Sequence, residues 1–206
     1  MRLVALAAGF TLLTTFDQVR VYKQDVPDGP PRLRAEGVLA APAWAVREVV
    51  LHPSRFEDVT PYLAVERPLA AEACAEGAKE LPGCKRIVVY NRYDPPLVAG
   101  RDQTLVVEIV EDALPDGAFE LTWKLAADRG PPPVEGVTRM RRSEGRWRLR
   151  AEGERTAYGY EVWADPGGLP GWLVNRANAR QVPSVIAAIE RGARRLDAER
   201  RAAPKP

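Results

Sequence analysis

The amino-acid sequence predicts an α+β fold, in which an antiparallel sheet is covered by one long C-terminal helix. Between residues 16 and 163, most stretches show the two-residue apolar period of strands, and each is bounded by Gly, Pro or Asp. After residue 168 the apolar spacing becomes that of a helix. Strands in consecutive order form antiparallel sheets, and one amphipathic helix can cover the apolar face of such a sheet.

The length and the composition of the chain suit a single domain. A chain of 206 residues can bury one substantial core. We expect one domain over residues 1–199 and a frayed tail over residues 200–206. The formal net charge of +2 balances 30 basic against 28 acidic side chains. This balance points to no nucleic-acid partner and to no membrane partner.

The N-terminal residues resemble a short secretory signal, because Arg2 precedes the mostly apolar run from Leu3 to Leu13. The run lacks a small-x-small cleavage pattern and is too short to cross a bilayer. We therefore predict a first helix that leads into a strand over residues 16–23. A cytoplasmic location follows from this interpretation, with export to the periplasm as the alternative.

The first half of the chain continues with a strand over residues 32–39 and a short helix that Pro42 opens and Pro53 ends. The clearest later strand places Phe119, Leu121 and Trp123 on one face, as the two-residue period requires. Further strands are predicted over residues 62–69, 86–90, 104–110, 118–125, 134–142, 146–151 and 155–163.

The C-terminal helix follows the turn sequence at residues 165–168. Its apolar stripe consists of positions three or four residues apart, namely Val182, Ile186, Ile189, Ala193 and Leu196. Pro183 removes a backbone donor, so we expect it to bend or divide the helix.

Cysteine and histidine usage limits the chemistry of the chain. Cys74 and Cys84 flank a Gly- and Pro-containing turn, so they suit either a disulfide or two reduced, partly buried thiols. We slightly favour the reduced form. His52 is the single histidine, so a zinc site would lack its usual ligands. The sequence also lacks the common nucleophile, phosphate-loop and dinucleotide motifs. We expect neither an enzyme nor a metal or cofactor.

Three segments resemble the START family of lipid-transfer domains. Val19–Tyr22 is similar to the opening strand of such domains, with Phe10 before it where a Trp is usual. Tyr93–Asp102 resembles the family's Pro-rich turn, which Arg-Asp follows at the start of a strand. Gly145–Asn175 resembles the last two strands, the Pro/Gly turn and the entry to the C-terminal helix. On these segments the chain is identified as a member of the family, of the bacterial type, within the helix-grip SRPBCC superfamily.

The resemblance implies a helix-grip fold, in which a curved antiparallel sheet wraps around the long C-terminal helix and encloses an apolar cavity. It also implies that the chain binds a lipid or another hydrophobic small molecule in this cavity, and transfers or sequesters it. We expect the C-terminal helix to gate the cavity, the domain to act as a monomer, and contact with a membrane to be transient.

In the family, the arginine of the Arg-Asp pair points into the cavity and pairs with an acid from an earlier strand. Arg101 matches this arginine, and Glu66 is the best-placed acid; a purely structural ion pair is the alternative. Alternation places Tyr158 and Tyr160 on the face opposite Trp163, so we favour these tyrosines as lining residues. The complete set of predicted ligand-binding residues is Glu66, Arg101, Leu105, Val107, Leu121, Trp123, Met140, Tyr158, Tyr160 and Asn175.

The gate is predicted at the turn before the C-terminal helix and along that helix. Glycines permit backbone rearrangement there, while apolar side chains offer contacts to a ligand or a membrane. The predicted gate residues are Gly168, Leu169, Trp172, Leu173 and Ile186. The alternative is that the turn simply begins a helix.

Two other functions remain as alternatives. A cyclase or aromatase of the polyketide type has a related fold, and would use Glu66, Arg101 and the tyrosines as acid, base or positioning groups. Such an enzyme should have a wet channel with converging polar groups, whereas a carrier should be mainly apolar. A domain that binds another protein should have a filled cavity and an apolar surface patch.

Overall fold

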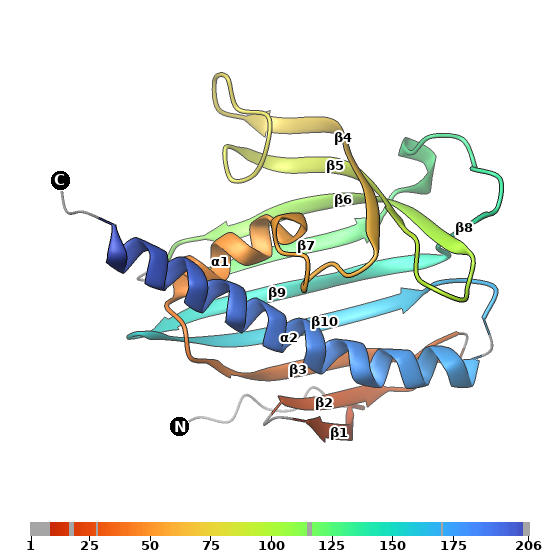
Figure 1. Cartoon of the computed structure of the whole chain (residues 1–206), viewed down its shortest axis with the longest axis horizontal. Coiled ribbons are helices and arrows are strands. Elements are labelled where there is room, and N and C mark those ends of the chain that lie inside the picture. Colours follow the sequence, from red (N-terminus) through yellow and green to blue (C-terminus); the bar gives the residue numbers. More distant parts are fainter. Residues whose placement is uncertain (1–8, 17–18, 28, 115–116, 170, 204–206) are drawn as a thin grey trace.

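The computed structural model describes residues 9–16, 19–27, 29–114, 117–169 and 171–203. These residues form ten strands in one sheet, two α-helices and two short 3-10 helices at Pro53–Arg55 and Ala127–Arg129 (Figure 1). The strands are β1 (Thr11–Phe16), β2 (Val19–Gln24), β3 (Arg32–Leu39), β4 (Leu63–Cys74), β5 (Cys84–Tyr93), β6 (Gly100–Asp112), β7 (Ala118–Leu125), β8 (Val137–Arg139), β9 (Arg142–Glu152) and β10 (Arg155–Asp165). The helices are α1 (Ala43–Leu51) and α2 (Gly171–Ala202).

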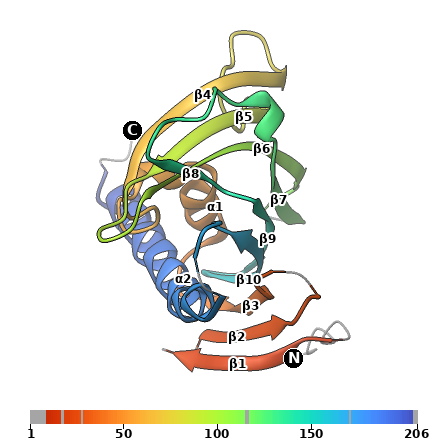
Figure 2. The ribbon, with the colours of Figure 1, turned by 90° about the vertical axis from the view of Figure 1, so that its right-hand side faces the viewer.

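The sheet has the order β1-β2-β3-β10-β9-β7-β6-β5-β4. All neighbours in this order are antiparallel, and the short strand β8 pairs in parallel with the start of β6. Figure 2 shows that the sheet is strongly curved and that both helices lie against its concave face. The predicted α+β fold, a curved sheet around a long C-terminal helix, is therefore confirmed.

The core fills one half of the space between the sheet and α2. Helix α1 buries Val46 and Val49 completely, and α2 crosses it closely at Gly192. A Cβ atom at Gly192 would lie 2.9 Å from the Phe56 ring, so this crossing requires the glycine. The predicted stripe on α2 faces this core, because Val182, Ile186, Ile189 and Ala193 are buried and Leu196 packs against them. The other half of the concave face receives the N-terminal half of α2.

The N-terminal prediction is wrong where the structure describes it. Leu12 and Leu13, which we expected in a first helix, belong to strand β1, and residues 1–8 of that helix lie outside the described residues. Thr11 precedes these leucines and Thr14 and Thr15 follow them, and β-branched residues favour strands. Strand β1 forms its backbone hydrogen bonds with β2 and leaves Leu12 58% exposed.

The C-terminal helix is one continuous element. Of the two outcomes expected at Pro183, a bend or a division, the division does not occur, and the hydroxyl of Ser184 donates to the Arg180 carbonyl at 2.9 Å in the turn that lacks the proline donor. The helix also extends beyond residue 199, where we expected a frayed tail. Arg201 contacts Glu154 and donates to Asp197 at 2.8 Å, so the last turn is fixed to the β9–β10 connection.

The strands agree with the sequence periods except near residue 140 and at residues 16–23, a range that includes the end of β1 as well as most of β2. The strands predicted over residues 32–39 and 118–125 have the predicted bounds. The stretch over residues 134–142 instead divides into β8 and the start of β9. Two strands pair with the same edge of β6. Strand β7 pairs with residues 105–112 of β6, and β8 pairs with residues 100–102, which β7 does not reach.

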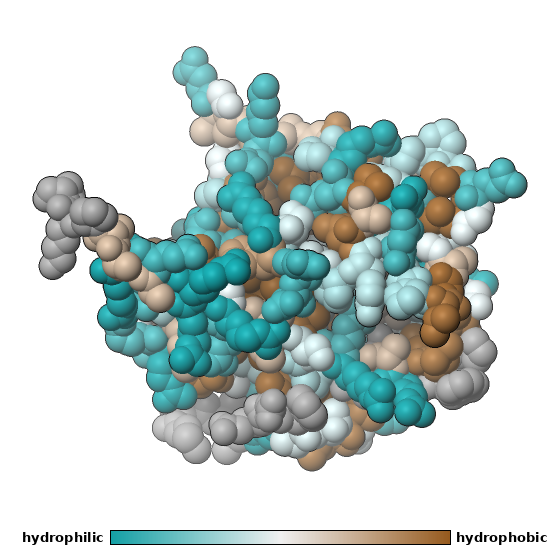
Figure 3. All heavy atoms as spheres, in the orientation of Figure 1, coloured by the Kyte–Doolittle hydropathy of each residue, from teal (hydrophilic) through white to brown (hydrophobic). Residues whose placement is uncertain are grey.

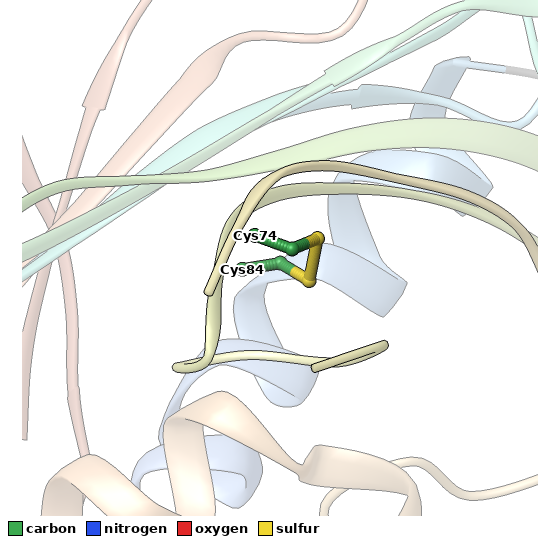
Figure 4. Close-up of a disulfide and its surroundings, with 2 residues drawn as sticks. All are labelled: Cys74 and Cys84. Atoms are coloured by element: carbon green, nitrogen blue, oxygen red, sulfur yellow. A yellow bond between two sulfur atoms is a disulfide. The ribbon is translucent and has the colours of Figure 1, made fainter. Parts of the chain in front are cut away.

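Cys74 and Cys84 form a disulfide between β4 and β5 (Figure 4), so the reduced form that we favoured is wrong. The two residues are direct partners in the β4–β5 register. A Gly- and Pro-containing turn brings them together, which the spacing alone left open.

We expect the Cys74→Ala/Cys84→Ala variant to lose about 2–3 kcal/mol of unfolding free energy, because the bond closes a short loop in the unfolded chain. Urea denaturation of the variant and of the wild type, each with and without dithiothreitol, measures this loss. The reduced wild type should match the variant. Equal midpoints for all four samples would contradict the prediction.

Candidate functional site

An internal cavity of about 700 Å³ lies between the concave face of the sheet and the N-terminal half of α2. Strands β5, β6, β9 and β10 contribute its walls, and the β8–β9 connection and the turn before α2 contribute to its rim. Most of the lining side chains are apolar, among them Leu33, Val98, Met140, Val162, Ala164, Leu169, Leu173, Val174, Ala177, Val182 and Val185. This space is the candidate ligand site.

A second hollow, of about 1000 Å³, lies between α1, the β9–β10 connection and the end of α2. Most of its charged side chains already pair with one another, and Arg200 lies over the Trp44 ring. Arg47 contacts Asp112, and Arg201 contacts Glu154 and Asp197. We therefore take the internal cavity, and not this surface hollow, as the functional site.

The cavity exists because the core is confined to one end of the sheet. On β6, Arg101 and Gln103 face the cavity, whereas Leu105 and Val107 follow on the same face toward the core. Leu105 and Val107 were predicted to line the cavity, and they do not. Helix α1 fills the space above that part of the strand, and the sequence period gives the face of a residue but not what covers it.

Polar side chains gather at the inner end of the cavity, on neighbouring positions of β5 and β6. Tyr93 pairs with Arg101 in the strand register, and Asn91 pairs with Gln103. Asn91, Arg101 and Gln103 are 8%, 8% and 6% exposed. Each has a buried atom that lacks a hydrogen-bond partner, namely Asn91 Oδ1, Arg101 Nε and Gln103 Oε1. Buried polar atoms are usually satisfied, so the atoms of Arg101 and Gln103, which line the cavity, suit a bound ligand. Asn91 lies beside them but does not line the cavity.

The predicted ion pair between Arg101 and Glu66 is absent from the structure. Glu66 is exposed on the edge strand β4 and accepts a hydrogen bond of 2.7 Å from the Ser54 hydroxyl. Its direct neighbour in the sheet is Asn91 of β5, and β5 separates it from β6. Two strand spacings separate the two backbones by roughly 10 Å, and the Glu66 carboxylate is directed to Ser54 instead of across β5. Glu66 is therefore no partner of Arg101 and does not line the cavity.

Aromatic side chains form one wall of the cavity. Tyr160 and Trp123 line it, and the Tyr160 ring lies 6.0 Å from that of Trp123 and 4.3 Å from that of Trp147. Burial raises the pKa of the Tyr160 phenol. Since the hydroxyl stays protonated near neutral pH, it can donate a hydrogen bond to a ligand.

Two of the predicted lining residues lie instead in the core. Tyr158 and Leu121 are 7% and 4% exposed and belong to the core cluster near α1. Alternation correctly placed Tyr158 on the inner face with Tyr160, while Trp163 lies on the outer face against Arg32 and Arg142. Residues on the inner face of one strand therefore lie either in the core or at the cavity, depending on their position along the strand.

Of the predicted gate residues, some line the cavity and one lies in the core. Leu169 and Leu173 line the cavity, and Gly168 is exposed in the turn before α2 with a positive φ of 63°. Ile186 is 1% exposed within the core, so it cannot belong to a gate. The side chains of Trp172 and Asn175 lie outside the described part of the chain.

Among the polar lining residues that the sequence patterns did not indicate are Tyr93 and Gln103, on either side of Arg101. Gln103 could have been found, because it lies two residues after Arg101 and therefore on the same face of the strand. Tyr93 required the register between β5 and β6, which sequence periods do not give. Met140 was predicted and does line the cavity; its amide donates to the Asp102 carbonyl at 2.9 Å.

An ion pair on the outer face of β6 supports this end of the site. Arg139 donates to both carboxylate oxygens of Asp102, at 3.1 and 2.9 Å, and the Tyr90 hydroxyl donates to the same carboxylate at 3.1 Å. The Asp102 side chain is 1% exposed. Asp102 is the neighbour of both Arg101 and Gln103, so the pair fixes the strand that carries them.

Apolar side chains are exposed at the rim of the cavity. Tyr62, Leu97 and Val98 are 59%, 103% and 38% exposed, and Tyr62 and Val98 also line the cavity. Tyr62 and Leu97 adopt positive φ angles of 65° and 68°, which non-glycine residues rarely do. In Figure 3, hydrophobic residues gather on the side where the β5–β6 connection and the start of α2 lie in Figure 1. We call Tyr62, Leu97 and Val98 the rim cluster.

Comparison with solved structures identifies the fold. A STAR-related lipid transfer protein from Xanthomonas axonopodis superposes with a TM-score of 0.73 and 24% identity, over 90% of this chain and 99% of that one. Human STARD10 gives a TM-score of 0.77 at 14% identity, over 96% of this chain and 78% of its own. Human StAR-related lipid transfer protein 5 gives 0.75 at 14% identity, over 94% and 90%.

Sequence comparison adds nothing to this result, since no protein-family model and no curated protein matches the chain. At these identities the structural likeness establishes the fold. The chain has the helix-grip fold of START domains, as the three sequence segments predicted.

Proposed function

We propose that the protein binds a lipid or another hydrophobic small molecule in the internal cavity and transfers or sequesters it. The observation that carries this proposal is the cavity of about 700 Å³ with a mainly apolar lining and a polar inner end. Such a space suits an apolar ligand that a few polar groups orient. Three proteins with the same fold are named for STAR-related lipid transfer or belong to that named series, which supports the proposal.

The composition of the lining favours a carrier over the cyclase alternative. The titratable side chains among the described lining residues are two arginines, Arg101 and Arg180, and three tyrosines, Tyr62, Tyr93 and Tyr160. Burial raises the pKa of Tyr93 and of Tyr160, so these phenols act as donors near neutral pH and not as bases. General acid–base catalysis works best with a group whose pKa lies near the working pH.

Identification of a bound molecule tests the proposed function. The protein is purified without detergent and examined intact by native mass spectrometry, and its organic extract is then analysed by mass spectrometry. We expect a stoichiometric hydrophobic molecule, or the uptake of one when the protein is incubated with lipid vesicles. A protein that is empty and takes up no lipid would refute the carrier proposal and favour a cyclase or an interaction domain.

We further propose that the turn before α2 and the first turns of α2 gate the cavity, and that the rim cluster contacts a membrane during exchange. Leu169 and Leu173 close one side of the cavity, and the positive φ of Gly168 lies in the turn that would have to move. Leu97 is fully exposed beside the rim, where an apolar side chain gains most from entering a bilayer.

For the Leu97→Gln variant, in which the exposed residue outside the cavity lining is changed, we expect the rate of fluorescent lipid transfer between vesicles to fall at least about tenfold, since burying one leucine contributes about 1.5–3 kcal/mol. Equilibrium lipid binding should stay unchanged. Val110→Gln is the matched control, because Val110 is 53% exposed near the other end of β6. Equal transfer rates for all three proteins would argue against the rim cluster as the membrane contact.

The disulfide bears on the compartment in which the protein works. Disulfides persist mainly in oxidising compartments, so the bond between Cys74 and Cys84 favours periplasmic export over the cytoplasmic location that we expected. Alkylation of the protein in intact cells, followed by mass spectrometry, tests this proposal. Blocked cysteines would support an oxidising compartment, and two alkylated thiols would support the cytoplasm.

A further inference from the structure

Arg101 brings a positive charge to the cavity that no acidic side chain neutralises. The residue is 8% exposed, its Nε atom has no hydrogen-bond partner, and its Nη1 atom contacts the Ala99 carbonyl. Within the part of the chain that the structure describes, no carboxylate oxygen lies within 4.0 Å of its nitrogen atoms. The acid that sequence analysis assigned to it, Glu66, is occupied at the edge of the sheet.

The next residue on the same strand is also charged and buried, but its charge is compensated within the protein. Asp102 points to the outer face and receives two hydrogen bonds from Arg139 and one from Tyr90. The outward charge is therefore compensated within the protein, whereas the inward charge of Arg101 is not. An uncompensated buried charge is unfavourable, so a ligand that supplies the opposite charge would be stabilised strongly.

The Gln103 amide beside Arg101 adapts to such a ligand but does not select its charge. Its Oε1 atom lacks a donor. A half-turn of the side-chain amide exchanges this oxygen for an N–H group, so the amide can accept from a ligand hydroxyl or donate to a ligand oxygen. The selection of charge therefore depends on Arg101, whose guanidinium suits carboxylate and phosphate oxygens.

We propose that the ligand is an amphiphile with an anionic head group, a carboxylate or a phosphate, which lies against Arg101. Its apolar part would extend along Tyr160, Trp123 and the inner face of α2. This inference rests on the proposed function, because it requires that a hydrophobic molecule occupies the cavity. It departs from the expectation of an internal ion pair, in which the ligand would be neutral at this point.

Three probes with the same tail and different heads test the inference: dodecanoate, dodecyl phosphate and dodecanol. Each is titrated against the protein loaded with the neutral fluorescent probe N-phenyl-1-naphthylamine. We expect at least one of the two anions to displace the fluorescent probe at a concentration about tenfold or more below that of dodecanol, as a charge-assisted hydrogen bond in a buried site would give. The stronger of the two anions identifies the head group as carboxylate or phosphate.

Variants assign the preference to Arg101. In Arg101→Gln the anion-to-alcohol ratio should fall to about one while dodecanol binding is kept, and in Arg101→Lys part of the ratio should remain. Arg191→Gln is the matched control, because Arg191 is an exposed arginine of α2 that does not line the cavity. It should leave the ratio unchanged.

The outcomes separate this inference from the proposed function. If dodecanol displaces the fluorescent probe as well as the anions do, or if the preference survives in Arg101→Gln, the anionic head group is refuted while the carrier function stands. If the wild type binds neither the fluorescent probe nor any of the three amphiphiles, both fail. Should Arg101→Gln not fold, the ratio in the wild type and in Arg101→Lys still decides.

Discussion

Replacement of Asp102 by leucine is expected to lower the free energy of unfolding by about 3 kcal/mol, because it breaks a buried ion pair and leaves the other charge uncompensated. Arg139 would lose both hydrogen bonds to the carboxylate, and the Tyr90 hydroxyl would lose its acceptor. The Arg139 side chain is 24% exposed, so water relieves part of the cost and keeps it near the lower end of the usual range. Urea denaturation followed by circular dichroism measures the change.

Two further variants test whether the loss of stability comes from the one charge that is left without a partner in the buried pair. The double variant Asp102→Leu/Arg139→Met should recover most of the stability, since it removes both charges together. Glu120→Ala removes the acid that Arg148 contacts on the outer face, where the arginine side chain is 63% exposed. This variant should change the unfolding free energy by less than about 1 kcal/mol. A double variant as unstable as Asp102→Leu would contradict the ion-pair explanation.

The sheet and the helix cover were predictable because they depend on local periods. The strand that contains Phe119 and Leu121 has a two-residue period, and the helix that contains Ile189 has an apolar stripe at helical spacing. Those periods determine which face of each strand or helix is buried. Strand β1 was missed because its leucines lack a clear alternation with polar residues, so a short apolar run suited a helix equally well.

The candidate site was only partly predictable, because it depends on positions along elements and on the register between them. Arg101 was found because its Arg-Asp pair resembles that of START domains, and Tyr160 was found because alternation places it on the inner face of its strand. Leu105 shares the inner face of β6 with Arg101 but is buried away from the cavity, and Ile186 on α2 belongs to the core. The error at Glu66 came from register, because only the fold shows that β5 separates its strand from that of Arg101.

The absence of the expected acid changes what the cavity selects. With an internal ion pair, the polar end of the cavity would be electrically neutral and would favour a ligand hydroxyl or carbonyl. With Arg101 alone, the same position attracts an anion, while the apolar lining around Tyr160 still excludes a small hydrophilic anion. Selection for an amphiphile thus needs both features, and neither follows from the fold by itself.

Occlusion of the cavity is expected to abolish most of the lipid binding while the fold is kept. Ala164 lines the cavity from β10, and a tryptophan at this position would occupy space that the ligand needs. We expect the dissociation constant of N-phenyl-1-naphthylamine to rise at least about tenfold for Ala164→Trp, since overpacking of a filled space costs about 1–3 kcal/mol. Fluorescence titration measures the constant, and circular dichroism checks the fold.

The matched control is Ala157→Trp, which adds the same side chain to the same strand on its outer face. Ala157 lies opposite Arg150 of β9 and outside the cavity, so the fluorescent probe should bind this variant as it binds the wild type. If both variants bind the probe equally well, the binding occurs elsewhere, and the exposed rim cluster becomes the first surface to test. If only Ala164→Trp loses binding, the ligand lies between the sheet and α2, because the two substitutions differ only in the face and the position of the strand that carries the added ring.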